Sequence, residues 1–136
     1  MLILSLLTCT AVSGDDSMDE IVKIKINDEV FDVELENNSA AQELVKTLKK
    51  GNITVNATEY GGFEKVGELG FSLPADDEIV DTQPGDIVLY QGNQISLFYG
   101  SHSWSYTKLG KIANADSNHL KEVLGPGDAT LVFSLK

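Results

Sequence analysis

The sequence predicts one mainly β domain built from antiparallel strands. The segments "IVKIKINDEVFDVEL" and "PGDIVLYQGNQISLFYG" each contain two apolar-rich stretches joined by a short polar turn, which is the pattern of a β-hairpin. Two other segments have the apolar spacing of short helices. With 136 residues, the chain is long enough for one sizeable core and too short for two ordinary domains.

The first hairpin is expected directly after residue 21. Apolar and polar residues alternate on both sides of a turn at Asn27 and Asp28. This register places Ile24 opposite Phe31 on one face and Lys23 opposite Asp32 on the solvent face. An antiparallel pair with one buried face is the result.

A helix is predicted over residues 39–50. Ser39 and Gln42 have the spacing of a capping box, and Gly51 is suited to end the helix. The apolar stripe is formed by Leu44, Val45 and Leu48. The segment 52–60 then returns to a strand, and residues 61–81 predict loops with only short extended pieces.

The second hairpin is expected around a type II′ turn at Gly92 and Asn93. Its predicted register sets Val88 opposite Leu97 and Tyr90 opposite Ile95. Both faces are apolar, which favours strands that are covered on both sides in a barrel or a sandwich. After it, "YTKLGKI" predicts a strand, "SNHLKEVLG" a helix ended by Gly125, and "ATLVFSL" a closing strand.

A family resemblance extends these local predictions. The segment "PGDIVLYQGNQISLFYGSHSWSYTKLGKI", preceded by "IKINDEVFDVEL" and followed by "GDATLVFSL", resembles the small bacterial cyclophilin-like fold proteins. The resemblance implies a closed eight-stranded β-barrel with a short helix over each open end, spanning residues 21–136. Where the family typically has arginine in this region, the chain has Lys108.

Residues 1–20 are set apart from the domain. The apolar start "MLILSLL" is too short to span a bilayer, and Ala11 and Ser13 fit the small residues that precede a signal-peptide cleavage site before Gly14. Export to the periplasm, cell surface or medium is therefore expected, although no basic residue precedes the apolar run. A lipoprotein anchored through Cys9 and a disordered cytoplasmic tail are the two alternatives.

Composition excludes one class of partner. The net charge is −11 and the chain contains no arginine, so neither a phosphate-neutralising patch nor a guanidinium fork is available for nucleic acid. The two histidines and the single cysteine form no set with zinc-ligand spacing, and no glycine-rich phosphate loop is present. We expect neither a metal nor a cofactor.

The aromatic-rich segment from residue 98 to 112 is the best candidate for a site. A loop over residues 100–105, at a barrel edge, would place aromatic rings beside small hydroxyls, an arrangement common in ligand clefts. The predicted cleft residues are Tyr60, Phe63, Tyr99, Ser101, His102, Ser103, Trp104 and Tyr106. We expect them to bind a small molecule or peptide without catalysis, since neighbours such as Ser101 and His102 seldom point at each other.

Two other functions remain open at this point. The resemblance suggests a peptidyl-prolyl isomerase, but true cyclophilins act through an arginine that donates to the prolyl peptide bond, and lysine lacks that planar donor pair. The other alternative is an accessory module that acts through protein contacts. An accessory module should be recovered without a bound small molecule.

The N-terminal segment yields a direct prediction. Mature protein recovered from its host should begin at or near Gly14, or carry a lipid on Cys9, because the apolar run and the small residues after it match an export sequence. N-terminal sequencing and intact mass spectrometry would measure this. A cytoplasmic protein that retains Met1 would contradict it.

Overall fold

The computed structural model describes residues 21–136. The expected export segment, including Cys9 and the cleavage position before Gly14, lies outside the described residues. No helix within the described part is long and apolar enough to cross a membrane.

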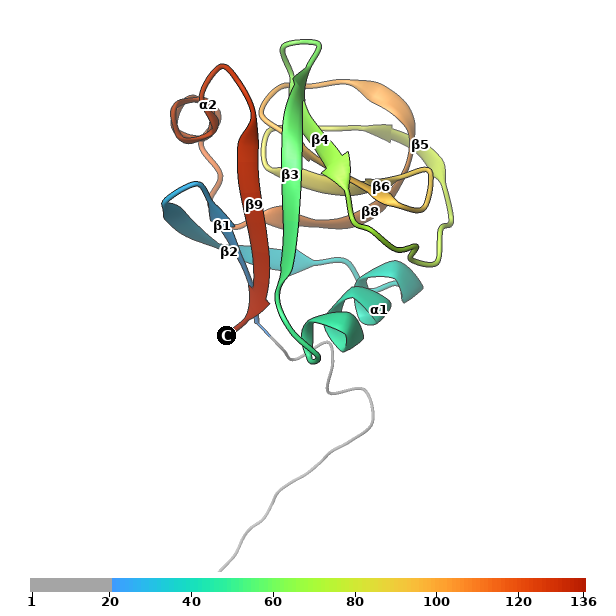
Figure 1. Cartoon of the computed structure of the whole chain (residues 1–136). Helices are drawn as coiled ribbons and strands as arrows, with labels where there is room; N and C mark the ends of the chain where they lie inside the picture. The colour runs from blue at the N-terminus through green and yellow to red at the C-terminus, as the bar shows by residue number, and fades with distance from the viewer. Residues whose placement is uncertain (1–20) are drawn as a thin grey trace, which may run out of the picture.

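Eight antiparallel strands close into a barrel in the described residues, with two short helices (Figure 1). In chain order the elements are β1 (Val22–Ile26), β2 (Glu29–Leu35), α1 (Ser39–Leu48), β3 (Ile53–Tyr60), β4 (Glu64–Glu68), β5 (Glu78–Asp81), β6 (Asp86–Tyr90), β7 (Gln94–Phe98), β8 (Ser103–Ile112), α2 (Ser117–Leu124) and β9 (Ala129–Leu135). The order around the barrel is β2-β1-β9-β3-β4-β7-β6-β8. The strand β5 pairs with the N-terminal part of β8. The mainly β, eight-stranded barrel is confirmed.

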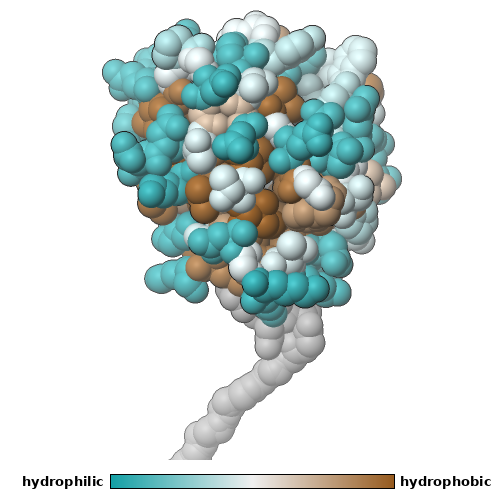
Figure 2. Space-filling model, in the orientation of Figure 1, coloured by the Kyte–Doolittle hydropathy of each residue, from teal (hydrophilic) through white to brown (hydrophobic). Residues whose placement is uncertain are grey.

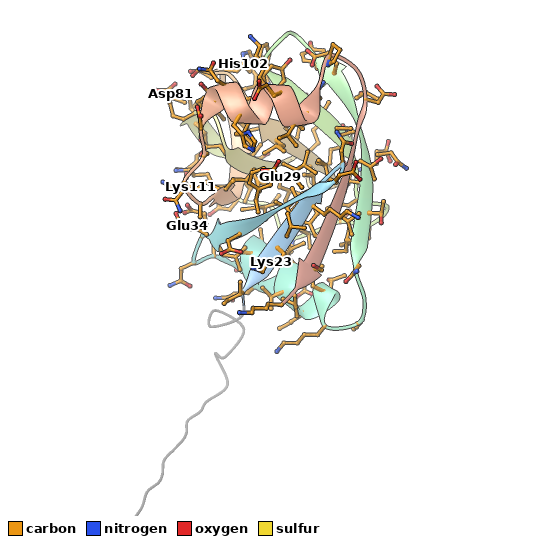
Figure 3. The ribbon with its side chains drawn as sticks, turned by 90° about the vertical axis from the view of Figure 1, so that its left-hand side faces the viewer. Lys23, Glu29, Glu34, Asp81, His102 and Lys111 are labelled. Atoms are coloured by element: carbon orange, nitrogen blue, oxygen red, sulfur yellow. The ribbon has the colours of Figure 1, made fainter. Side chains whose placement is uncertain are left out.

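Pairing of β2 with β8 closes the barrel. Val33 pairs with Ile112, and Leu35 pairs with Gly110. A Cβ atom at Gly110 would lie 2.5 Å from a backbone oxygen of β2, so only glycine permits this approach. Glu34 and Lys111 lie side by side at the junction (Figure 3).

The first hairpin has the predicted register. Ile24 pairs with Phe31, and the Lys23 ammonium lies 2.5 Å from the Asp32 carboxylate on the exposed face. Asn27 adopts a positive φ of 54°, which asparagine tolerates better than most residues. The short turn therefore determines which residues of β1 and β2 enter the core.

The helix α1 is confirmed, but its predicted cap is wrong by one residue. Asn38, not Ser39, caps the helix: its side-chain oxygen accepts the Ala41 N–H at 2.8 Å. The Asn38 amide also donates to the Lys108 carbonyl of β8 at 2.8 Å, a long-range bond that a shorter serine side chain would not make. The cap thus joins α1 to the barrel wall.

Both helices contribute to the interior. The predicted stripe of Leu44, Val45 and Leu48 is buried in the barrel core, together with Leu120 and Leu124 of α2. Figure 1 shows α1 near the end of the barrel where the C-terminus lies and α2 near the opposite end. As predicted, α2 ends at Gly125, which has a φ of 73°.

The register predicted for the second hairpin is wrong by one residue. Ile87 pairs with Leu97 and Tyr90 with Gln94, because three residues, 91–93, connect the two strands instead of the expected two. Gln91 and Gly92 both have positive φ, and the Asn93 N–H donates to the Tyr90 carbonyl, so the expected type II′ turn at Gly92 and Asn93 does not form. A shift of one residue on one strand changes which side chains face each other.

Strands β6 and β7 are buried on both faces, as predicted. Their inward side chains join the barrel core: Ile87, Leu89, Ile95 and Leu97. Their outward side chains Val88 and Phe98 join a second apolar cluster with Val80 and Tyr106. By contrast, the face over β3 and β9 carries mostly hydrophilic side chains broken by small apolar patches (Figure 2).

Leu97 provides a test of the core. Because its side chain is fully buried in the barrel, Leu97→Ala should lower the free energy of unfolding by about 2–5 kcal/mol. Val30→Ala, at an exposed position of β2, should change it by less than about 0.5 kcal/mol. Chemical denaturation measures both, and a loss below about 1 kcal/mol for Leu97→Ala would contradict this packing.

Candidate functional site

An aromatic cleft of about 720 Å³ lies on the outer face of the barrel. It is bounded by the β3–β4 turn, by β4, by the facing ends of β6 and β7, and by β8 with the loop before it. Its ten lining residues are Tyr60, Gly61, Phe63, Glu64, Val66, Tyr90, Gln94, His102, Trp104 and Tyr106. We refer to this set as the outer cleft.

The second apolar cluster supports the floor of the outer cleft. Phe98 and Tyr106 are buried, and their rings meet edge to face with centroids 5.6 Å apart. Tyr90 packs against Tyr106 at 5.9 Å in the same manner. Burial, together with the nearby Glu64 carboxyl, raises the pKa of Tyr106 to about 12, so its hydroxyl stays protonated at neutral pH.

The β3–β4 turn positions two more rings. Gly61 has a φ of 67°, and a Cβ atom there would lie 2.3 Å from the Phe63 ring, so the turn requires glycine at this point. The Phe63 ring folds back over Gly61 and meets the Tyr60 ring edge to face at 6.0 Å. The Tyr60 side chain is 61% exposed. A glycine turn thus fixes one wall of the outer cleft.

A stack of three rings extends from Phe63 through His102 to Trp104. The His102 ring lies nearly parallel to the Phe63 ring at 4.4 Å and to the Trp104 ring at 6.4 Å. The backbone of His102 is held by Thr82, whose N–H donates to the His102 carbonyl at 3.0 Å and whose hydroxyl accepts the His102 N–H at 2.9 Å. Figure 3 shows His102 and Asp81 near the same end of the molecule. Trp104 is 55% exposed at the rim.

Glu64 is the one acidic side chain of the outer cleft. It is only 6% exposed, and Ser96 donates a hydrogen bond to its Oε1. Within residues 21–136, the other oxygen, Oε2, receives no hydrogen bond. Burial raises the pKa of Glu64 above its usual value, and the Ser96 hydrogen bond offsets this only in part.

The structure brings five of the eight predicted site residues together. Those that line the outer cleft are Tyr60, Phe63, His102, Trp104 and Tyr106. Ser101 and Ser103 do not line it, and Ser103 instead donates to Asp81. The reason is that β8 begins at Ser103, so the expected loop is shorter and side chains alternate between faces. His102, Trp104 and Tyr106 are alternate residues on one face.

Tyr99 also lies away from the outer cleft, because it follows the outward-facing Phe98. Its hydroxyl donates to the Glu59 carboxylate at 2.6 Å, and burial together with this bond raises the pKa of Tyr99 to about 12. Burial opposes ionisation of Glu59, yet the hydrogen bonds from Tyr99 and Lys65 lower its pKa. Tyr99 and Glu59 line a separate hollow of about 510 Å³ beside α2.

The fully buried Lys65 completes this second network. Its ammonium lies 3.0 Å from Glu59 and donates to the Gly125 and Gly127 carbonyls at 2.8 and 2.5 Å. It also lies 5.6 Å from the centre of the Tyr99 ring. All three N–H donors of the ammonium are therefore used. We infer that Lys65 has a structural role, because it links β4 to the segment after α2.

Four lining side chains were not among the predicted residues: Glu64, Val66, Tyr90 and Gln94. Alternation along "FEKVG" predicts that Glu64 and Val66 share one face of the strand and that Lys65 and Gly67 share the other. Burial of Glu64 depends on the turn at residues 61–62 and on Ser96 of β7. Neither is visible from the local sequence.

The chemical groups of the lining are mostly aromatic rings. They include His102 and Glu64 but no serine, threonine, cysteine or lysine that would act as a nucleophile beside them. Across residues 21–136, no three histidine, cysteine or acidic side chains are grouped so as to hold a metal ion. Flat rings with a few polar groups are the usual composition of a ligand site.

Glu64 gives a prediction about pH. Its pKa in the folded state exceeds the usual 4.5, so the folded protein binds more protons than the unfolded chain just above pH 4.5. The wild-type protein should therefore lose stability relative to Glu64→Gln as pH rises through that window, by at most about 1.4 kcal/mol per pH unit.

Denaturant titrations of both proteins between pH 4 and pH 8 would measure this difference. Glu68→Gln, at an exposed position of the same strand, serves as the control and should show no such trend. A difference between wild type and Glu64→Gln that is constant with pH, or that changes in favour of the wild type, would contradict the raised pKa.

Comparison with known proteins adds a family to this geometry. The model of the cyclophilin-like family matches residues 24–134, which span β1 to β9. No curated protein matches the chain significantly. The match covers nearly all of the described domain, including every residue of the outer cleft, and agrees with the resemblance drawn from the sequence. The chain belongs to the cyclophilin-like family.

Proposed function

We propose that the outer cleft binds a small organic ligand, or a single side chain of a peptide, through a flat apolar group, and that it does no chemistry on it. The observation that carries this proposal is a cleft of about 720 Å³ lined by aromatic rings, two of which are more than half exposed. Ligand sites usually have volumes of about 300–1,000 Å³ and a mostly apolar lining.

Exposure of Tyr60 and Trp104 supports a binding role. Large apolar rings grouped on a surface are unfavourable in water, and such patches often mark recognition sites. Here the rings project from a turn and a strand that are tied to the barrel, so little conformational entropy is lost when a ligand packs against them. The exposed patch therefore suits reversible binding.

The isomerase alternative has less support. The sequence contains no arginine, and the outer cleft is lined by no lysine, so neither a guanidinium nor an ammonium of its own is placed to polarise a prolyl peptide bond. Its polar groups are hydroxyls, an amide, an imidazole and a buried carboxyl. These groups suit recognition of a ligand better than stabilisation of a twisted amide.

Trp104 tests the binding proposal. Because Trp104 is a rim residue, Trp104→Ala should weaken binding of an aromatic probe by about tenfold or more while changing the melting temperature by no more than about 2 °C. NMR titrations with benzamide and with N-acetyl-phenylalaninamide would measure affinity and separate a free small molecule from a peptide side chain. Ile79→Ala, exposed on β5 outside the cleft, is the matched control.

Two results would contradict the proposal. One is that neither probe shifts resonances of the outer cleft, or that Trp104→Ala binds them as well as wild type does. The other is that the purified protein accelerates cis/trans exchange of a prolyl peptide far beyond its uncatalysed time of tens of seconds, and that Trp104→Ala abolishes the acceleration.

A further inference from the structure

We propose that the outer cleft selects ligands that carry an organic ammonium group, which sits among its aromatic rings and pairs with the Glu64 carboxylate. This inference rests on the proposed function and specifies the ligand's chemistry. It comes from the charge of the lining, the oxygen of Glu64 that no described residue pairs with, and the kind of rings that line the same cleft.

The lining has an unbalanced charge. Among the ten residues of the outer cleft, Glu64 is the only acid, and no lysine is present. The nearest lysine in the sequence, Lys65, points to the opposite side of β4, where its ammonium is held by Glu59 and two backbone carbonyls. It therefore does not neutralise Glu64.

The Glu64 carboxyl has room for one more partner. Ser96 satisfies Oε1, and within the described chain no donor reaches Oε2. A buried polar oxygen without a partner is unfavourable, and a buried charge without a counter-ion is more so. A positively charged ligand would balance the charge, and an N–H or O–H on it would pair with the oxygen. A neutral ligand could supply only the hydrogen bond, so the charge is what distinguishes a cation.

The rings that line the outer cleft suit a cation as well. Tyr60, Tyr90, Trp104 and Tyr106 all line the cleft, and the faces of tyrosine and tryptophan rings attract ammonium groups. Several such rings grouped around a cavity form the kind of cage that recognises alkylated ammonium groups. His102 is the one basic side chain of the lining, so all probes are compared at a single pH, pH 8, at which the cleft has the same charge for each.

A matched pair of probes tests the inference on the full-chain protein. Choline and 3,3-dimethyl-1-butanol have nearly the same shape, but only choline carries a positive charge. At pH 8 and constant ionic strength, choline should bind at least about tenfold more tightly than the alcohol, as measured by NMR titration, with shifts at Tyr60 and Trp104. The charge, and not the size, is then what the cleft selects.

Glu64→Gln tests the role of the carboxylate. Glutamine keeps an oxygen that accepts from Ser96 but has no charge, so this variant should bind choline and the alcohol with similar affinity. The control Glu68→Gln changes the net charge equally on the same strand, outside the cleft, and should keep the preference for choline.

The outcomes separate this inference from the proposed function. Equal binding of choline and the alcohol by the wild-type protein would overturn cation selection, while binding of benzamide would still support the cleft as a ligand site. Binding of neither probe would also overturn the inference. A preference for choline that persists in Glu64→Gln would overturn the role of the carboxylate. The comparison of the two probes on the wild type remains decisive even if Glu64→Gln does not fold.

Discussion

Closure of the sheet between β2 and β8 is the constraint on which the rest of the molecule depends. Gly110 allows the two backbones to approach at this junction, where a larger residue would collide with a carbonyl of β2. Once the sheet is closed, each of its eight strands has a neighbour on both sides over part of its length. The N-terminal part of β8 pairs with β5. The interior is filled by aliphatic side chains from the barrel strands and both helices. A closed, filled barrel gives the outer side chains of β4, β6, β7 and β8 fixed positions.

The inward and outward side chains of the same strands make different kinds of contact. On β4, Lys65 points inward and all its donors are used by Glu59 and two carbonyls, while Glu64 points outward with a single serine as its partner. On β7, Leu97 packs in the barrel core, while Phe98 supports the floor of the outer cleft. The inner network is internally compensated and the outer carboxyl is not. This difference is why we assign stability to the inner face and recognition to the outer one.

Sequence reasoning predicted the fold well and the site in part. The first hairpin was predicted correctly because one face of its strands is clearly apolar and its turn is short. In the second hairpin both faces are apolar, so the pattern did not specify the register, and the three-residue turn at residues 91–93 decided it. Alternation along "HSWSY" would have separated the cleft rings from the serines. Burial of Glu64 arises from contacts between β4, β7 and the β3–β4 turn, so no local pattern predicts it.

The ionisation of Glu64 is the property to measure, because this carboxyl is the group that the charge of the proposed ligand would meet. Carbon-13 NMR of the labelled side-chain carboxyl would follow its titration in the free protein and with saturating choline or 3,3-dimethyl-1-butanol. A bound cation favours the ionised form, so choline should lower the pKa of Glu64 from its raised value in the free protein, and the alcohol should not lower it. An identical Glu64 titration with and without choline would contradict the pairing of a bound cation with this carboxylate.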